Sequence, residues 1–440
     1  MSLARRLASQ STIIFGGRLF GAGLVFLVQA FIAQVWGAAI LGDYLIIIAA
    51  VNLIAVAMPL GFQTIGTYFA AEYRAHNDRR QLVAFLFRAY GHVGLAFLAV
   101  ALLGPAALDW FDLGTHVVAV HFIPVAMLAL ATALVYVNGA VLVGLKRPFA
   151  GFFADGIFRP MLVLGAVLGC AAVLQPPEEA FGVMLWIIAL GYVLIALVHM
   201  GFVIATLPQV GDLAETRGAD VPRWWRFAAP WALITLATDF FFDIDLLLLA
   251  NLLGREELAI FGVCTRVFAL VSFGVAAVYA VILPDMFESE AKSDRAAFHR
   301  KLGEANLAAS IVSLVLFGLV LVGAPFALLL FGPDFTAGAL PLAILCLGLV
   351  VRSVMGPASM VLSIHDRPWA SLPAVLLGVG TLVAGNFVLV PVFHLVGAAL
   401  AAIIAISVWS VALWLIALRT AQIDVSIRQW VRTRLIVAAE

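Results

Sequence analysis

Twelve long apolar stretches, separated by short polar loops, dominate this chain. About 20 apolar residues in a helix span the hydrocarbon core of a bilayer, and lipid offers the backbone no hydrogen-bond partners. Each stretch is therefore predicted to be a transmembrane helix. The predicted spans are 13–36, 41–67, 82–106, 116–145, 150–174, 181–207, 227–253, 258–284, 303–330, 338–363, 369–391 and 396–419.

The charged residues are few, and their placement predicts the orientation of the chain. They make up 11% of the 440 residues, compared with about 25% in a soluble domain. Nineteen of the 25 lysines and arginines lie at the termini or in one set of loops, whereas the opposite loops contain only Arg255. The positive-inside rule then predicts a multi-pass membrane protein with both termini in the cytoplasm.

The basic loops also repeat along the chain. Arg147-Pro148 recurs as Arg367-Pro368, and "HNDRRQL" at 76–82 corresponds to "KSDRAAF" at 292–298. Six spans in each half would make the repeats parallel, as in transporters whose halves rock around a central site. Chance similarity between short basic loops is the alternative. The predicted domains are an N-terminal six-helix lobe (1–207), a cytoplasmic linker (208–226), a C-terminal six-helix lobe (227–419) and an amphipathic cytoplasmic tail (420–440).

Five arginines lie inside predicted spans. A charge at the bilayer centre costs at least ~2.5–3.5 kcal/mol, so such residues usually face a cavity or a partner. Asp155 precedes Arg159 by four positions, which predicts an ion pair within one helix. For the other four, an anionic substrate is the expected partner, although those near the inner surface could instead snorkel. These candidates for substrate binding are Arg18, Arg88, Arg266 and Arg352.

Uncharged polar residues extend the candidate site onto the first two spans. Gln29 lies on the same helical face as Arg18 in the first span. Asn52 and Gln63 are eleven positions apart and share a face of the second span. Such stripes indicate either a wet interior surface that contacts substrate or hydrogen bonds between helices.

Carboxylates interrupt the seventh predicted span. Asp239 and Asp243 are four positions apart and share a face, whereas Asp245 points elsewhere. Carboxylates at membrane depth are typical of proton and ion pathways, so this pair is predicted to couple transport to protons or Na⁺. Pairing with Arg266 or Arg352 for structural reasons is the alternative.

The start of the chain resembles a known family of transporters. The stretch "FGGRLFGAGLVFLVQAFIAQVWGAAILGDYLI" places Gly17-Arg18 in the first span and Leu41-Gly42-Asp43-Tyr44 at the turn that follows. "VLVGLKRP" at 141–148 adds a short Gly-x-x-Arg/Lys turn after the fourth span. With the twelve spans, these features resemble the polysaccharide-type flippases of the multidrug/oligosaccharidyl-lipid/polysaccharide exporter superfamily.

The resemblance implies an all-α membrane protein whose two lobes form a V-shaped bundle. Its expected activity is to carry oligosaccharides linked to undecaprenyl diphosphate from the inner to the outer leaflet by alternating access. The product would serve surface polysaccharide assembly (O-antigen of lipopolysaccharide, capsule or exopolysaccharide). Cavity arginines would meet the diphosphate, because a guanidinium group binds phosphate oxygens bidentately.

The resemblance also sets the expected partners. These are the lipid-linked oligosaccharide, membrane lipids and other assembly proteins such as a polysaccharide polymerase. We expect no cofactor, no bound metal and no nucleic-acid partner. Among the candidate arginines, Arg18 has the direct support of the family pattern, and the other three depend on the charge argument.

Four other functions are weighed against this one. A cation-coupled drug or metabolite antiporter of the same superfamily would line its cavity with carboxylates and aromatic residues. A polymerase would need a large outer loop, and a glycosyltransferase using Asp243-Ile-Asp245 would need soluble segments; the chain has neither. A facilitator-type sugar transporter would have a glycine-framed basic loop. No H-E-x-x-H, G-x-S-x-G or P-loop occurs, so we predict that the protein is not an enzyme.

Overall fold

A computed structural model shows the chain as an all-helical protein over the residues that it describes. Those residues are 3–110, 114, 116–211, 220–291, 294–365 and 367–431. Side chains are described from Gly16 onward, except at positions 18, 280, 283–285, 287, 290, 291, 363 and 368. The chain divides into an N-terminal unit, Met1–Ile244, and a C-terminal unit, Asp245–Glu440.

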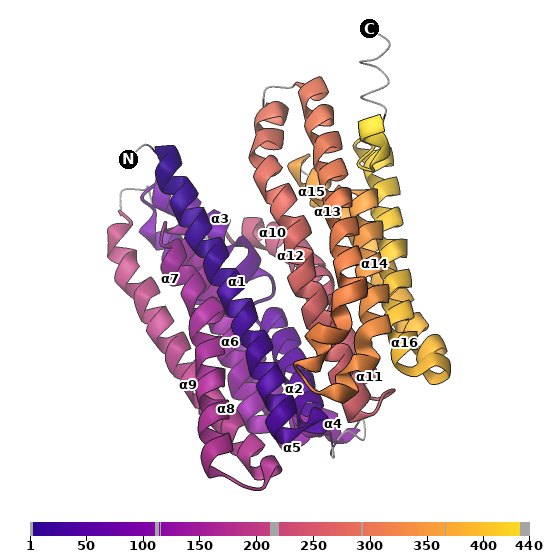
Figure 1. Cartoon of the computed structure of the whole chain (residues 1–440). Coiled ribbons are helices and arrows are strands. Elements are labelled where there is room, and N and C mark those ends of the chain that lie inside the picture. The colour runs from indigo at the N-terminus through magenta and orange to yellow at the C-terminus, as the bar shows by residue number, and fades with distance from the viewer. Residues whose placement is uncertain are drawn as a thin grey trace. The chain divides into compact units, whose positions relative to one another are not determined.

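The N-terminal unit is a bundle built around α6. Its helices are α1 (Leu3–Trp36), α2 (Ala38–Ala57), α3 (Phe62–Ala75), α4 (Arg79–Trp110), α5 (Val117–Val120), α6 (Phe122–Gly144), α7 (Pro148–Phe153), η1 (Ala154–Phe158), α8 (Arg159–Val173), α9 (Pro177–Thr206), η2 (Leu207–Gln209) and α10 (Val221–Asp239). Contacts run from α1 to α2, α6, α9, α8 and back to α1, and these helices lie side by side in Figure 1. Fourteen of the 23 residues of α6 are buried, against six of the 32 residues of α4, so α6 is the central helix.

The C-terminal unit is organised around α14. After α11 (Phe241–Leu249), which crosses the boundary between the units, its helices are α12 (Arg255–Ala291), α13 (Arg295–Leu329), η3 (Pro333–Gly338), α14 (Ala339–Met355), α15 (Ala358–Ile364), η4 (Pro368–Ser371) and α16 (Leu372–Thr420). Helix α14 packs against α12, α13 and α16.

Helix α16 is a hairpin of two helices. The backbone breaks at His394 (φ 48°, ψ −127°). A Cβ built on Gly385 lies 3.0 Å from the Ala401 side chain, and one built on Gly378 lies 2.8 Å from Trp409. The midpoint of each pair along the chain lies within one residue of the break, so the two arms run antiparallel. The predicted spans 369–391 and 396–419 correspond to these arms.

Ten helical segments of the described chain are long and apolar enough to cross a membrane. The hairpin α16 counts as one of them, and the predicted span 227–253 is absent from the set because it breaks at Phe240 between α10 and α11. The arrangement of twelve helices in two parallel repeats therefore stays a prediction as a whole.

Two other predicted spans break well inside their length, and 116–145 is interrupted near its start at His121, between α5 and α6. The span 41–67 ends as a helix at Ala57 and resumes at Phe62, because Leu60 (φ 52°) and Gly61 (φ 88°) adopt left-handed conformations. The span 338–363 breaks at Gly356 (φ 84°) and Pro357 between α14 and α15. Proline lacks the N–H that a continuing helix needs, which accounts for the second break.

The repeated Arg-Pro turns have matching local structure. Arg147 N–H donates to the Leu142 carbonyl and Arg367 N–H to the Leu362 carbonyl, both over 2.8 Å. Each proline then opens the next helix at a position where its missing N–H costs nothing. Each guanidinium also reaches the end of a later helical segment in its own unit: Arg147 donates to Gln209 at the end of η2, and Arg367 donates to the Thr420 carbonyl at the end of α16.

The second pair of repeated loops shares a helix cap. The Asp78 carboxylate accepts a hydrogen bond from Gln81 N–H (3.0 Å) at the start of α4. Asp294, 216 positions later, does the same for Ala297 N–H (2.9 Å) at the start of α13. A carboxylate at this position satisfies an otherwise unpaired helical N–H. These loops therefore share a structural role beyond their positive charge.

An ion cluster holds α10 against α3 in the N-terminal unit. Arg223 forms a bidentate pair with Glu72, over 2.7 and 2.9 Å, and its guanidinium lies 5.2 Å from the Phe69 ring. The hydrogen bonds that Arg223 donates to the Glu72 carboxylate raise the pKa of Arg223. Beside it, the indole N–H of Trp224 donates to the Tyr73 hydroxyl (2.6 Å), whose pKa burial raises to about 12.

Replacing Arg223 by alanine should lower the free energy of unfolding by about 1–3 kcal/mol, the usual value of a hydrogen bond to a charged group. Thermal unfolding in detergent measures the loss. Arg226→Ala is the control, because Arg226 is exposed on the same helix and stacks on its neighbour Phe227. Equal losses in both variants would contradict a specific role for the Arg223 pair.

Candidate functional site

A cavity of about 510 Å³ lies within the C-terminal unit. It is formed by α12, α14, the break before α15, and the second arm of α16. Its lining residues are Ser272, Val275, Ala276, Tyr279, Leu349, Arg352, Ser353, Gly356, Pro357, Ala358, Ser359, Met360, Trp409, Ser410 and Leu413. We call it the Arg352 cavity, because Arg352 is its one charged lining residue within the described part of the chain.

Arg352 is exposed into this cavity among aromatic side chains. Its guanidinium carbon lies 5.9 Å from the centre of the Trp409 ring, a cation–π distance. The Tyr279 hydroxyl lies close enough to Arg352 for an electrostatic interaction. It donates a hydrogen bond to Asn306 Oδ1 (3.3 Å). A cation beside aromatic faces and serine hydroxyls can bind an anion and stack against sugar rings.

The cavity exists because α14 stops three residues after Arg352. Gly356 takes a left-handed conformation, and a Cβ added there would overlap the Val425 carbonyl oxygen. Irregular backbone at membrane depth is tolerated where it is buried in protein or lines a cavity. The Gly356-Pro357 break is therefore a structural requirement of the site.

The chain after α16 packs against this break and against the helices beside it. Residues 423–426 are buried, the Val425 carbonyl accepts from Asn306 Nδ2, and Ile427 N–H donates to the Val354 carbonyl (2.9 Å). The sequence predicted an amphipathic cytoplasmic tail from residue 420. The described part of that segment instead packs into the C-terminal unit, because its backbone pairs with α13 and α14.

The other deep arginine of the C-terminal unit, Arg266, does not line the Arg352 cavity. It lies partly buried on α12, a turn and a half before Ser272, which does line it. The Nε atom of Arg266 is buried. Arg352 therefore lines the cavity and Arg266 does not, although the sequence predicted substrate binding for both.

A polar network lies inside the N-terminal unit. Arg159 pairs with Asp155 over 3.2 Å and stacks on the Tyr192 ring (4.9 Å), while the Tyr192 hydroxyl donates to Asp155 (2.8 Å). The predicted ion pair is therefore present. Tyr136 lies close enough to Arg159, Asp155 and Asp243 to interact with their charges.

The predicted coupling carboxylates differ in burial. Asp243 is 6% exposed and accepts a hydrogen bond from Asn52 Nδ2 (3.3 Å), whereas Asp239 is exposed and bonds to Thr238. Asp245, in the C-terminal unit, is fully buried and accepts from Asn386 Nδ2 (2.6 Å). Asp243 is thus the carboxylate of the predicted pair that lies next to the polar network of the N-terminal unit.

The remaining candidates are scattered over the N-terminal unit. Gln29 is buried, with its Oε1 unpaired among the described residues, and Arg88 is exposed on α4. Gln63 is buried on α3 and donates to the Val56 carbonyl (3.0 Å), so the break at Gly61 removes the face it was predicted to share with Asn52. The side chain of Arg18 lies outside the described residues.

Three functional candidates were missed in the sequence. Tyr279 and Trp409 lie in apolar spans without any charged neighbour nearby, so nothing distinguished them from core residues. The Gly356-Pro357 pair did carry a signal, since this dipeptide marks a break inside a helical pattern. Among described residues, no group of three or more His, Cys, Asp or Glu side chains could hold a metal ion.

Comparison with known proteins identifies the fold. No protein-family model matches the sequence, and no curated protein gives a significant match. The inward-facing conformation of a multidrug resistance MATE family transporter of the MOP superfamily aligns with a TM-score of 0.69 at 14% identity, covering 96% of this chain and 95% of that one. The lipid II flippase MurJ, in an inward closed conformation, aligns with 0.71 at 11% identity, covering 96% and 90%.

A third structure shows how this fold varies in its sites. It is a MOP superfamily transporter from Pyrococcus furiosus, described as having a binding pocket of reverse polarity, with a TM-score of 0.55 at 13% identity and coverage of 96% and 94%. The fold of the present chain is therefore that of MOP superfamily transporters, as the resemblance predicted, and the chain is a multi-pass membrane protein. Drug exporters and a lipid flippase share this fold, so the fold alone does not select a substrate.

Proposed function

We propose that this chain, with the fold of MOP superfamily transporters, is a flippase for oligosaccharides linked to a polyprenyl diphosphate such as undecaprenyl diphosphate. It would move them from the inner to the outer leaflet of the bacterial inner membrane, with both its termini in the cytoplasm. The transported units would feed a polysaccharide polymerase and other proteins of surface polysaccharide assembly.

The Arg352 cavity carries this proposal. A guanidinium group matches the geometry of phosphate oxygens better than any other side chain. Trp409 and Tyr279 add flat apolar faces suited to sugar rings, and the serines add hydrogen-bonding groups. A cavity of this chemistry favours an anionic, sugar-bearing substrate over a cationic drug.

Reconstitution into proteoliposomes tests the proposal. A lipid-linked diphosphate oligosaccharide is added to the membrane, and lectin accessibility in the opposite leaflet is followed over time. We expect the chain to accelerate its appearance there, and to act more slowly on the monophosphate-linked sugar. Transport of a lipophilic cationic dye without movement of the lipid-linked sugar would contradict the proposal.

The N-terminal unit supports a second candidate function, a cation-coupled drug or metabolite antiporter. The buried Asp243 beside Asn52, and Asp155 beside Tyr192, form an environment that could hold a proton or Na⁺ and attract cationic substrates. The dye measurement separates this function from the flippase. The same carboxylates would couple a flippase to an ion gradient.

Asparagine at position 243 should abolish the dependence of transport on an imposed proton or Na⁺ gradient, because an amide neither takes up a proton nor neutralises Na⁺. Transport rates with and without each gradient measure this dependence. Asp239→Asn should have a smaller effect, since Asp239 is exposed. Full gradient dependence in the Asp243→Asn variant would remove Asp243 from the coupling site.

A further inference from the structure

A second pocket of the C-terminal unit is rich in basic side chains. Its volume is about 280 Å³, and it shares no lining residue with the Arg352 cavity. The start of α13, the turn after α15 and the chain after α16 form its walls. The lining residues of this basic pocket are Arg295, Phe298, His299, His365, Ala421, Gln422 and Ile423.

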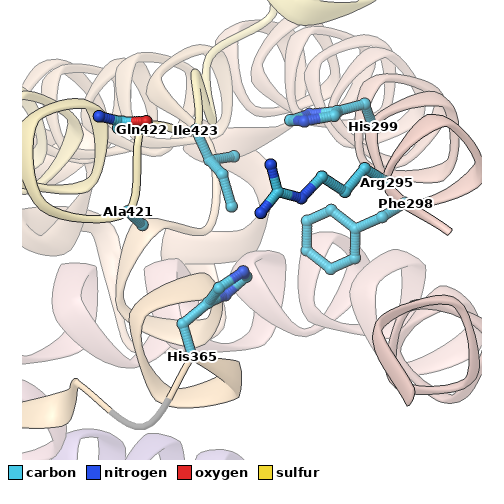
Figure 2. Close-up of a pocket in the computed structure, with 7 residues that line it drawn as sticks. All are labelled: Arg295, Phe298, His299, His365, Ala421, Gln422 and Ile423. Carbon is cyan, nitrogen blue, oxygen red and sulfur yellow. The ribbon is translucent and has the colours of Figure 1, made fainter. Parts of the chain in front are cut away.

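Nitrogen-bearing groups from two parts of the chain converge on this pocket. Figure 2 shows the Arg295 guanidinium extending between Ile423 and Phe298 toward His365, with the His299 ring at the edge. His365 is held in position, because its Nδ1 donates to the Val361 carbonyl (2.9 Å) and its ring packs edge-on against Phe298 (5.7 Å between centres). These two contacts fix the position of the His365 ring in the wall of the pocket.

No carboxylate appears among the described residues that line the basic pocket. Asp294, next to Arg295, caps α13 through the Ala297 N–H and is absent from the lining. A guanidinium group beside two imidazole rings can bind the oxygens of a phosphate group.

We propose that the basic pocket binds a phosphate group, and that its source is the headgroup of an anionic phospholipid. Phe298 and Ile423 give the pocket apolar walls, which suit the glycerol part of a lipid better than a free phosphate ion. The pocket also lies among the basic loops that the positive-inside rule assigns to the cytoplasmic surface, where anionic headgroups attract basic residues. This binding is independent of the substrate that the Arg352 cavity transports.

The full-length chain in nanodiscs tests the proposal. Replacing part of the phosphatidylcholine by phosphatidylglycerol should raise the midpoint of thermal unfolding. Arg295→Gln should remove at least half of this rise, whereas Arg300→Gln, which makes the same charge change at an exposed residue outside the pocket, should retain it. Equal losses in the two variants, or no effect of phosphatidylglycerol on the wild type, would overturn the proposal.

Two further measurements separate the phosphate sources and guard against misfolding of the variants. Inorganic phosphate added to phosphatidylcholine nanodiscs should leave the midpoint unchanged, and a rise would overturn the lipid source. In the wild type, phosphatidylglycerol should slow the modification of His365 by diethylpyrocarbonate relative to the exposed His76. Unchanged relative rates would overturn the proposal without the use of any variant.

Discussion

Glutamine in place of Arg352 should reduce transport of a lipid-linked diphosphate oligosaccharide by at least tenfold. Arg352 is the charged side chain that the described structure exposes into the cavity beside Trp409. Charge-assisted hydrogen bonds are each worth about 1.5–3 kcal/mol, and about 1.4 kcal/mol corresponds to a factor of ten in binding. Initial rates of leaflet exchange in proteoliposomes, at equal protein incorporation, measure the loss.

Two variants make this measurement specific. Arg352→Lys keeps the positive charge but loses the planar fork, so it should transport at an intermediate rate. Arg419→Gln makes the same charge change as Arg352→Gln at the exposed end of α16, outside the cavity, and should transport normally. Wild-type transport by Arg352→Gln would remove this residue from the substrate site and leave the flippase proposal without its main support.

Valine in place of Gly356 should prevent the C-terminal unit from reaching its native packing. The position requires φ near 84°, and any Cβ would overlap the Val425 carbonyl oxygen. Backbone strain at such a residue and overpacking each cost about 1–3 kcal/mol, so together they remove a large part of the about 5–15 kcal/mol that stabilises a typical domain. Size-exclusion profiles and thermal unfolding in detergent report the loss.

Gly318→Val provides the matched control for this prediction. Gly318 is exposed on α13, and a Cβ added there would meet no atom within 4 Å. It should therefore behave as the wild type. A folded, thermally stable Gly356→Val protein would mean that the backbone at the α14–α15 break can adopt another conformation, and that the cavity does not depend on it.

Much of the secondary structure followed from the sequence because lipid leaves the backbone few choices. An apolar stretch at membrane depth must satisfy its own hydrogen bonds, so runs such as 82–106 and 181–207 were predicted as helices and lie within α4 and α9. Local signals also predicted the ion pair of Asp155 and Arg159, since residues four apart meet on one helical face. Breaks inside apolar runs were missed, because hydropathy changes little where a glycine or a phenylalanine leaves the helix.

The candidate site was less predictable, because its residues come from distant parts of the chain. Arg266 and Arg352 are equivalent in sequence terms, since each lies deep in an apolar span without an acidic residue within four positions. Only packing distinguishes them: Trp409 of the second α16 arm lies over the Arg352 guanidinium, and Tyr279 of α12 lines the same cavity. Sequence spacing carries no information about such contacts.

The sequence by itself determined that this protein is a bundle of membrane helices with basic loops and repeated Arg-Pro turns, since the cost of unpaired backbone groups and of charges in lipid acts on each segment separately. Only the tertiary structure shows which arginine side chain lines a cavity. It also shows that the chain after α16 packs against the helix break beside that cavity. Those features depend on the antiparallel arms of α16 and on the Gly356 break, where the physical constraint is contact between backbone atoms about 70 residues apart in the chain.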